Sequence, residues 1–152
     1  DRSVSRGLGD VYKRQVEKDF SSHPGSENNQ MVLTIQPDLP EISADPERLI
    51  QVITNLVSNA ERHTRNGTIT ISLTGEPGWQ TICVSDTGTG MSEEMRKNAL
   101  KGYVSADKDY WRHGIGLYVC HQIITAHSGK IWLKSKEGEG TQVFFSLPEE
   151  ES

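Results

Sequence analysis

Four polar side chains recur at helical spacing in one segment of the chain. Asn55, Asn59, Arg62 and His63 fall within an arc of roughly 100° if residues 47–63 form a helix. Amide oxygens suit hard cations such as Mg²⁺, a guanidinium suits phosphate oxygens, and an imidazole can stack on a base. Together these groups could hold a magnesium ion and a phosphate, but taken alone an ordinary solvated helix face explains the same residues.

A second candidate is the segment 85–91, Ser-Asp-Thr-Gly-Thr-Gly-Met, which follows an apolar run. A carboxylate at the end of a buried strand, here Asp86, can accept a hydrogen bond from an exocyclic amine. Gly88 and Gly90 would let the backbone approach a flat ligand closely. An ordinary turn with Asp as its turn residue is the alternative. The triplet 86–88 also resembles the active site of retroviral-type aspartic proteases, in which two chains each supply one Asp.

A glycine pair, Gly114 and Gly116, precedes an apolar run that is typical of a helix. Glycines at a helix N-terminus leave backbone N–H groups free, and the helix dipole favours an anion there. The pair lacks the third glycine of a Rossmann motif and the Gly-Lys-Ser/Thr of a P-loop. A phosphate cradle and a flexible loop end are both compatible with this pattern.

Helices and strands must position these candidate residues, and the hydrophobic pattern predicts three helices and five strands. Asp45 before Pro46 is typical of a helix start, and residues 86–116 are expected to be mostly loop around one short helix. Paired strands between helices indicate an α+β two-layer sandwich with helices on one face of the sheet. The predicted helices are 47–63, 92–100 and 115–127, and the predicted strands are 31–36, 68–74, 79–85, 130–135 and 141–147.

The composition narrows the function classes. The chain has 152 residues and a formal charge of −5, from 16 Lys and Arg against 21 Asp and Glu. Such acidity argues against a nucleic-acid groove, which needs a basic face, and no run of about 18 apolar residues suggests a membrane span. We expect one domain over residues 16–150, a disordered or non-native tail over 1–15, and free thiols at Cys83 and Cys120.

The three candidate segments, in this order, resemble the ATP-binding domain of histidine kinases. Residues 55–64 (Asn-Leu-Val-Ser-Asn-Ala-Glu-Arg-His-Thr) are similar to its N box, 86–90 to its G1 box and 114–117 to its G2 box. The C-terminal segment 127–148 also fits, and the resemblance covers about residues 31–148. It implies membership of the GHKL superfamily and the Bergerat fold, a mixed sheet backed by three helices. The matching motifs of this C-terminal segment are His-Ser-Gly-Lys-Ile at 127–131, Ser135, Gly140-Thr141 and Phe-Ser-Leu-Pro at 145–148.

The resemblance implies ATP and Mg²⁺ as cofactors and gives each matched residue a role. Asn59 would coordinate the Mg²⁺ that bridges the phosphates, and Arg62 would contact a phosphate. Asn55 stands where hydrolysing relatives carry a glutamate base, and an amide cannot take a proton from water. The residues that would bind the adenine base are His63, Asp86, Gly88, Gly90 and Thr141. Those whose backbone would contact the phosphates are Gly114, Ile115, Gly116 and Leu117.

The implied activity is transfer of the ATP γ-phosphate to a histidine on a helical phosphoacceptor domain, with a response regulator as an indirect partner. The implied location is the cytoplasm, or the cytoplasmic part of a membrane-anchored kinase, with no membrane contact by these residues. His23 lies in a polar loop and does not fit an acceptor. The family's F box aligns with residues 99–103, where only Tyr103 keeps an aromatic ring. Two alternatives therefore stay open: a GHKL nucleotide-binding module without kinase activity, and an anti-sigma-type serine kinase.

Overall fold

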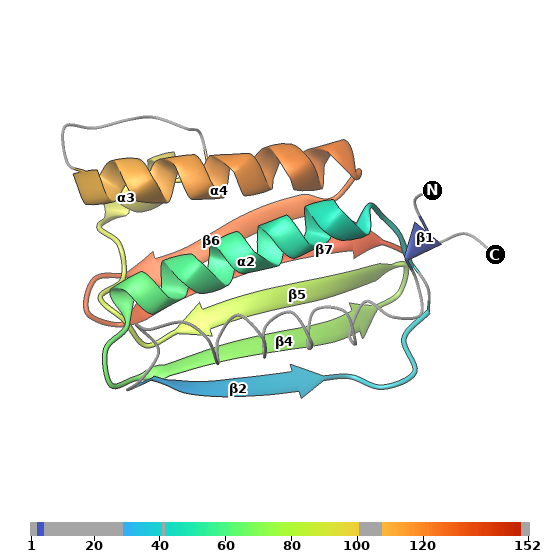
Figure 1. The fold of residues 1–152 in the computed structure, drawn as a ribbon, viewed down its shortest axis with the longest axis horizontal. Helices are drawn as coiled ribbons and strands as arrows, with labels where there is room; N and C mark the ends of the chain where they lie inside the picture. The colour runs from blue at the N-terminus through green and yellow to red at the C-terminus, as the bar shows by residue number, and fades with distance from the viewer. Residues whose placement is uncertain (1–2, 5–28, 41, 101–107, 150–152) are drawn as a thin grey trace.

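A five-stranded mixed sheet forms one layer of the molecule (Figure 1). The computed structural model describes residues 3–4, 29–40, 42–100 and 108–149, and it describes side chains for 29–40, 42–100 and 117–149. The strand order is β2-β4-β5-β7-β6; β2 is parallel to β4, and the other neighbours are antiparallel. The strands are β2 (Gln30–Ile35), β4 (Thr68–Glu76), β5 (Trp79–Asp86), β6 (Lys130–Lys136) and β7 (Gly140–Pro148).

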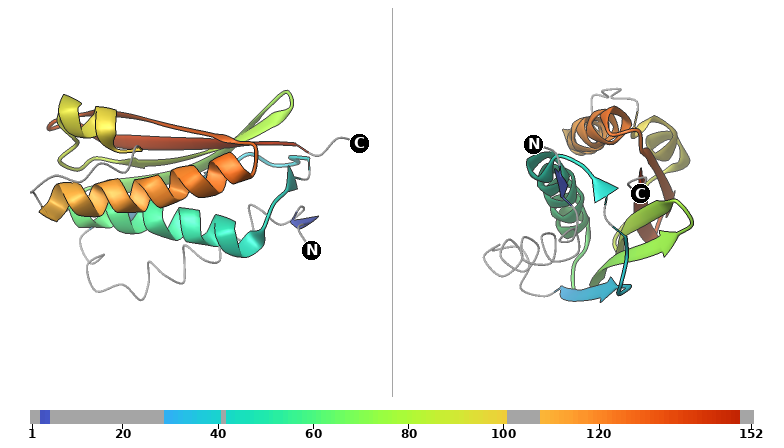
Figure 2. Two further views of the ribbon diagram at one scale, coloured as in Figure 1. Left: turned by 90° about the horizontal axis from the view of Figure 1, so that it is seen from above. Right: turned by 90° about the vertical axis from the view of Figure 1, so that its right-hand side faces the viewer.

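Two long helices cover one face of this sheet. The helices α2 (Pro46–His63) and α4 (Lys108–Ala126) lie side by side and antiparallel (Figures 1 and 2). The short helix α3 (Glu93–Asn98) packs beside the edge strand β6. The predicted α+β sandwich with a mixed sheet is thus confirmed. No helix in the described ranges has the length and apolar character needed to cross a bilayer.

Local chemistry explains where α2 begins and which face it buries. Asp45 Oδ1 accepts hydrogen bonds from the backbone N–H groups of Glu47 (3.0 Å) and Arg48 (3.4 Å), and Pro46 opens the helix. The apolar stripe of α2 then packs on the sheet, where each fully buried Leu or Ile contributes about 1.5–3 kcal/mol. The stripe consists of Leu49, Val52, Ile53, Leu56, Val57 and Ala60.

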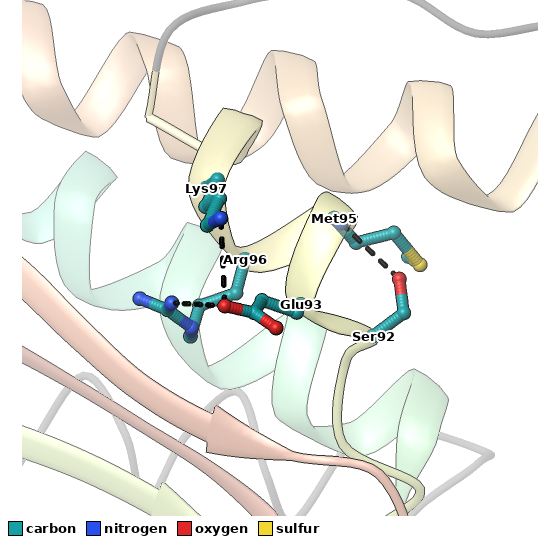
Figure 3. Close-up of polar contacts among 5 residues, drawn as sticks. All are labelled: Ser92, Glu93, Met95, Arg96 and Lys97. Carbon is teal, nitrogen blue, oxygen red and sulfur yellow. Dashed lines mark hydrogen bonds and ion pairs between the residues drawn. The ribbon is translucent and has the colours of Figure 1, made fainter.

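The helix α3 is shorter than the predicted 92–100, and Figure 3 shows why it starts where it does. Ser92 Oγ accepts a hydrogen bond from the Met95 N–H at 3.2 Å, which caps the first turn. Glu93 pairs with Arg96 (3.9 Å) and Lys97 (3.4 Å) one turn later. These exposed ion pairs add little stability, so α3 depends on its cap and on its contact with β6.

Two minor strands and two thiols complete the description. β1 (Ser3–Val4) pairs antiparallel with β3 (Ile42–Ser43), and a bridge joins Ile42 to Glu149 beyond the end of β7. Cys83 and Cys120 are both free thiols, as expected. The rest of the segment 1–15, the His23 loop and Tyr103 lie outside the described residues.

The start of α4 differs from the prediction. We expected residues 86–116 to be mostly loop and a helix to cover 115–127, but α4 already begins at Lys108. Gly114 and Gly116 therefore lie inside the helix rather than at its N-terminus. Glycine tolerates a helix interior at a cost of about 1 kcal/mol relative to alanine, so the pair did not fix the helix boundary. The strands β4 and β5 also extend one or two residues past their predicted ends, to Glu76 and Asp86.

Candidate nucleotide-binding site

Sheet register places Asp86 beside Thr141. Asp86 is the last residue of β5, and it pairs with Thr141 near the start of β7. Both residues face the helix layer and are buried, with 8% and 6% of their surface exposed. The N–H groups of Gly88 (2.9 Å) and Thr141 (3.3 Å) both donate to the same oxygen, Asp86 Oδ1. This carboxylate is therefore held in one orientation at the end of a central strand.

The environment of Asp86 opposes its charge. Burial raises the pKa of its carboxyl above the ordinary value, while hydrogen bonds from the Gly88 and Thr141 N–H groups and the nearby Thr64 hydroxyl partly offset the effect. Desolvation is the larger influence, since a carboxylate in a low-dielectric site loses hydration that few donors replace. A buried carboxyl with a perturbed pKa beside a pocket is a common mark of a functional site.

The glycines that follow Asp86 let the turn pack against its neighbours. A Cβ on Gly88 would collide with the His63 carbonyl at the end of α2, and a Cβ on Gly90, where φ is +70°, with the Lys136 carbonyl. Backbone bonds fix the same contacts: Thr89 N–H donates to His63 O (3.0 Å), and Gly138 N–H to Thr89 O (2.8 Å). The turn thus joins α2 to the β6–β7 hairpin.

Two pockets flank this turn. One, of ≈ 370 Å³, lies at the end of β5, β6 and β7; the other, of ≈ 530 Å³, lies at the end of α2 and carries two arginines. Thr87 lines both, so the two hollows meet at the turn. The first is lined by Ser85, Asp86, Thr87, Lys134, Ser135, Lys136, Glu139, Gly140, Thr141 and Gln142, and the second by Arg62, His63, Arg65, Thr87, Gly88 and Thr89.

The four polar residues of α2 lie in different surroundings. Arg62 is exposed and lines the larger pocket together with the half-buried His63. Asn59, one turn earlier, is 7% exposed, and its Oδ1 has no hydrogen-bond partner among the described residues. Asn55 faces α4 near the Cys120 thiol, whose Sγ donates to the Val52 carbonyl oxygen at 3.8 Å. Burial raises the pKa of that thiol to about 12, so it stays protonated and unreactive.

The G2-like segment lies apart from the predicted arrangement. Gly114, Ile115 and Gly116 belong to the interior of α4, where helical geometry directs their N–H groups to carbonyls one turn earlier. The side chain of Leu117 is 1% exposed and belongs to the hydrophobic core. In this conformation the segment offers no helix N-terminus to a phosphate.

Residue-level reasoning from the sequence gave no role to several of the lining residues, among them Arg65 and Ser135. Arg65 follows the end of α2 and adds a second guanidinium to the larger pocket. Ser135 contributes a hydroxyl to the smaller pocket. A signal for Ser135 existed, because it occupies an inward position of β6 two residues after Leu133 and four after Ile131, where alternation predicts another apolar side chain. Arg65 has no periodic signal.

Comparison with known proteins agrees with this geometry. A family model described as "Histidine kinase-, DNA gyrase B-, and HSP90-like ATPase" matches residues 44–151. The adaptive-response sensory kinase SasA of Synechococcus elongatus is 37% identical over 139 residues, covering 89% of this chain and 36% of the relative. SasA of Microcystis aeruginosa is 39% identical over 118 residues, covering 75% and 31%. The chain thus spans about a third of the length of these relatives.

Solved structures share the fold. The nucleotide-free catalytic domain of histidine kinase ThkA gives a TM-score of 0.83 at 24% identity, covering 98% of this chain and 97% of that one. Full-length ShkA in complex with AMPPNP gives 0.81 at 22% identity, covering 96% and 31%. ThkA in complex with the response regulator TrrA gives 0.78 at 24% identity, covering 97% and 42%. The Asp-Thr-Gly triplet therefore lies in a two-layer α+β fold and within the residues that the family model matches.

Proposed function

Because this chain belongs to the family of histidine kinase-, DNA gyrase B- and HSP90-like ATPases, we propose that it is the ATP-binding catalytic part of a sensor histidine kinase. Its curated relatives are named sensory kinases, and it spans about a third of their length. We therefore propose a helical phosphoacceptor domain as its direct partner and a response regulator as the indirect one. ATP is supplied in the cytoplasm, which supports a cytoplasmic location.

The observation that carries this proposal is the fixed, buried carboxylate of Asp86. Two backbone N–H groups donate to Oδ1, so an incoming amino group would meet the other oxygen, Oδ2. A 6-amino purine supplies such a donor, and hydrogen bonds to a charged, buried acceptor are the stronger kind. Thr141, beside Asp86 in the register, adds a hydroxyl to the same wall. Adenine recognition is the role that we assign to this pair.

The phosphates are assigned to the larger pocket. Arg62 and Arg65 supply guanidinium groups, whose planar donors match phosphate oxygens, and His63 lines the same pocket as a candidate base-stacking ring. Asn59 fits a Mg²⁺ ligand because its Oδ1 is buried and lacks a partner in the described part of the chain. A magnesium ion bound to the phosphates would neutralise the charge that develops during transfer.

The reaction that we propose is phosphoryl transfer rather than hydrolysis. Asn55 lies near the Cys120 thiol and carries an amide, which cannot remove a proton from water. The residues of the site would then bind and orient ATP while a histidine on the acceptor domain acts as the nucleophile. Backbone contacts from Gly114, Ile115, Gly116 and Leu117 to the phosphates would require α4 to begin near Gly114, with residues 108–113 outside the helix.

Calorimetric titration with a non-hydrolysable ATP analogue tests the binding step. We expect Mg²⁺-dependent binding by the chain and a loss of about 100-fold in affinity for Asp86→Asn, because the amide removes the charge on the acceptor. The matched control is Asp38→Asn, an exposed position with φ of +60° that asparagine tolerates. An Asp86→Asn variant that binds the analogue as tightly as the unchanged chain contradicts the assignment.

Phosphorylation of an acceptor tests the kinase step. The chain is incubated with ATP, Mg²⁺ and a histidine-containing helical acceptor domain, and the product is assayed for acid-labile phosphate. Acid-labile label supports a histidine kinase, and acid-stable label on a serine supports the serine-kinase alternative. Tight ATP binding with no transfer to any acceptor favours a nucleotide-binding module without kinase activity.

A further inference from the structure

We infer that Ser135 determines which purine the site accepts, by fixing the direction of the Thr141 hydroxyl group. The Ser135 hydroxyl lies at a junction of three elements. Its Oγ is 3.0 Å from the Gly140 carbonyl oxygen, 2.8 Å from Thr141 Oγ1 and 2.8 Å from the Met91 backbone nitrogen. This inference rests on the proposed function, since it concerns the base of the nucleotide.

Counting hydrogens assigns a direction to each bond. The Gly140 carbonyl can only accept, so Ser135 gives its single hydroxyl hydrogen to that oxygen. The Met91 N–H can only donate, so it occupies one acceptor position of Ser135 Oγ. The bond between the two hydroxyls must then run from Thr141 to Ser135. With one hydrogen donated and two accepted, Ser135 Oγ is saturated.

The consequence lies at Thr141. Its hydroxyl hydrogen is committed to Ser135, so Thr141 Oγ1 presents only acceptor lone pairs to any other group. Asp86, which receives the Thr141 N–H, is also an acceptor. The wall of the smaller pocket therefore combines two acceptors. It matches the amino group at position 6 of adenine and opposes the carbonyl oxygen at the same position of hypoxanthine or guanine.

The position of Ser135 supports a role beyond packing. β6 alternates, and its inward residues Ile131 and Leu133 pack against the core. At the third inward position an apolar residue would extend this core, but it would leave the Met91 N–H and the Gly140 carbonyl without these bonds and the Thr141 hydroxyl free to rotate. A freely rotating hydroxyl can donate as well as accept, so it would no longer discriminate between a 6-amino and a 6-oxo purine.

The test compares the affinities for ATP and inosine triphosphate (ITP), measured by calorimetry with Mg²⁺. Ser135→Ala is expected to lower the ATP-to-ITP affinity ratio about tenfold, mainly through tighter ITP binding, because Thr141 gains a hydrogen to donate to the 6-oxo group. Ser72→Ala, in β4, is the matched control and should leave the ratio unchanged. In a Thr141→Val background, Ser135→Ala should no longer change the ratio, because no hydroxyl remains to be directed.

Each outcome decides a different question. A Ser135→Ala variant that loses ATP and ITP affinity by the same factor overturns the inference and leaves Ser135 as a structural residue. A change of ratio that persists with Thr141→Val also overturns it. If alanine prevents folding, Ser135→Cys gives the same comparison, because a thiol has a similar shape but is a weak hydrogen-bond partner. An unchanged chain that binds neither nucleotide contradicts the proposed function itself. A changed or unchanged affinity ratio, by contrast, tests only the inference about Ser135.

Discussion

The two ends of the α2–α4 helix pair differ in how their buried polar groups are hydrogen-bonded. At the end where α2 starts, His127 donates from Nδ1 to the Ile123 carbonyl (2.8 Å) and accepts at Nε2 from the Asp45 N–H (3.1 Å). At the other end, Asn59 Oδ1 and Thr64 Oγ1 have no hydrogen-bond partner among the described residues, and burial raises the pKa of Asp86. Most buried polar groups in proteins are paired, so the unpaired atoms of Asn59 and Thr64 mark this end as the one at which a ligand is expected. The described part of α4 also holds an unpaired buried atom, His121 Nδ1.

This contrast predicts that substitutions at the two ends separate binding from stability. The largest effect is expected for Asn59→Ala. Loss of Oδ1 should abolish the Mg²⁺ dependence of nucleotide binding and lower phosphotransfer by at least about 100-fold, while the free energy of unfolding stays within about 1 kcal/mol. Calorimetry with and without Mg²⁺ and urea unfolding measure the two quantities. Gln122→Ala, an exposed amide at the far end of α4, is the control, and an Asn59→Ala variant that keeps its Mg²⁺ response contradicts the assignment.

The opposite pattern is expected for His127→Ala. Removing the imidazole leaves the Asp45 N–H and the Ile123 carbonyl without their side-chain partner, and this should lower the free energy of unfolding by about 1–3 kcal/mol. Affinity for the ATP analogue should change less than about twofold, because the His127 end lies away from both nucleotide pockets. Urea unfolding and calorimetry again decide. A large loss of affinity at unchanged stability would show that the two ends are not independent.

The sequence predicted α2 well because its boundary is encoded locally. Asp45, Pro46 and the apolar stripe lie within one segment, and the observed helix differs from the predicted one by a single residue at its start. The glycines at 114 and 116 are also a local signal, but the helix runs through them. A weak helix former lowers the stability of a helix without determining where it ends.

The spatial arrangement of the site was less accessible to sequence reasoning. Asp86 and Thr141 are 55 positions apart and meet only through the register of β5 and β7. Family resemblance, rather than periodicity, linked them. The Ser135 network depends on the same register, on β6 and on the path of the chain at Met91. Such long-range contacts follow from the packing of the whole sheet, so no local pattern predicts them.

A smaller effect concerns the pH dependence of stability at the ligand end. Because burial raises the pKa of Asp86, the folded chain holds the proton of this carboxyl more tightly than the unfolded chain does. Its contribution to stability is therefore most favourable at acid pH and is lost as the pH rises through the folded-state pKa. Asp86→Asn, which keeps a carbonyl acceptor without a charge, should gain stability relative to the unchanged chain over that rise. Thermal unfolding at several pH values measures the difference, and a difference in Tm that does not vary with pH contradicts this account.

The smallest effect is expected where α4 reaches the ligand end. If phosphate binding uses the N–H groups of Gly114 and Gly116, the helix must give up its bonds there, and alanine at either position should oppose this change. Each alanine favours the helix by about 1 kcal/mol, which corresponds to about fivefold weaker binding of the ATP analogue together with a higher Tm. Thr125→Ala raises helix propensity at an exposed position near the other end of α4, so it should raise Tm without weakening binding. Equal affinities for the Gly114→Ala and Thr125→Ala variants would show that α4 binds no phosphate through this pair, and the ligand end would then consist of α2, the turn 86–90 and the β6–β7 hairpin alone.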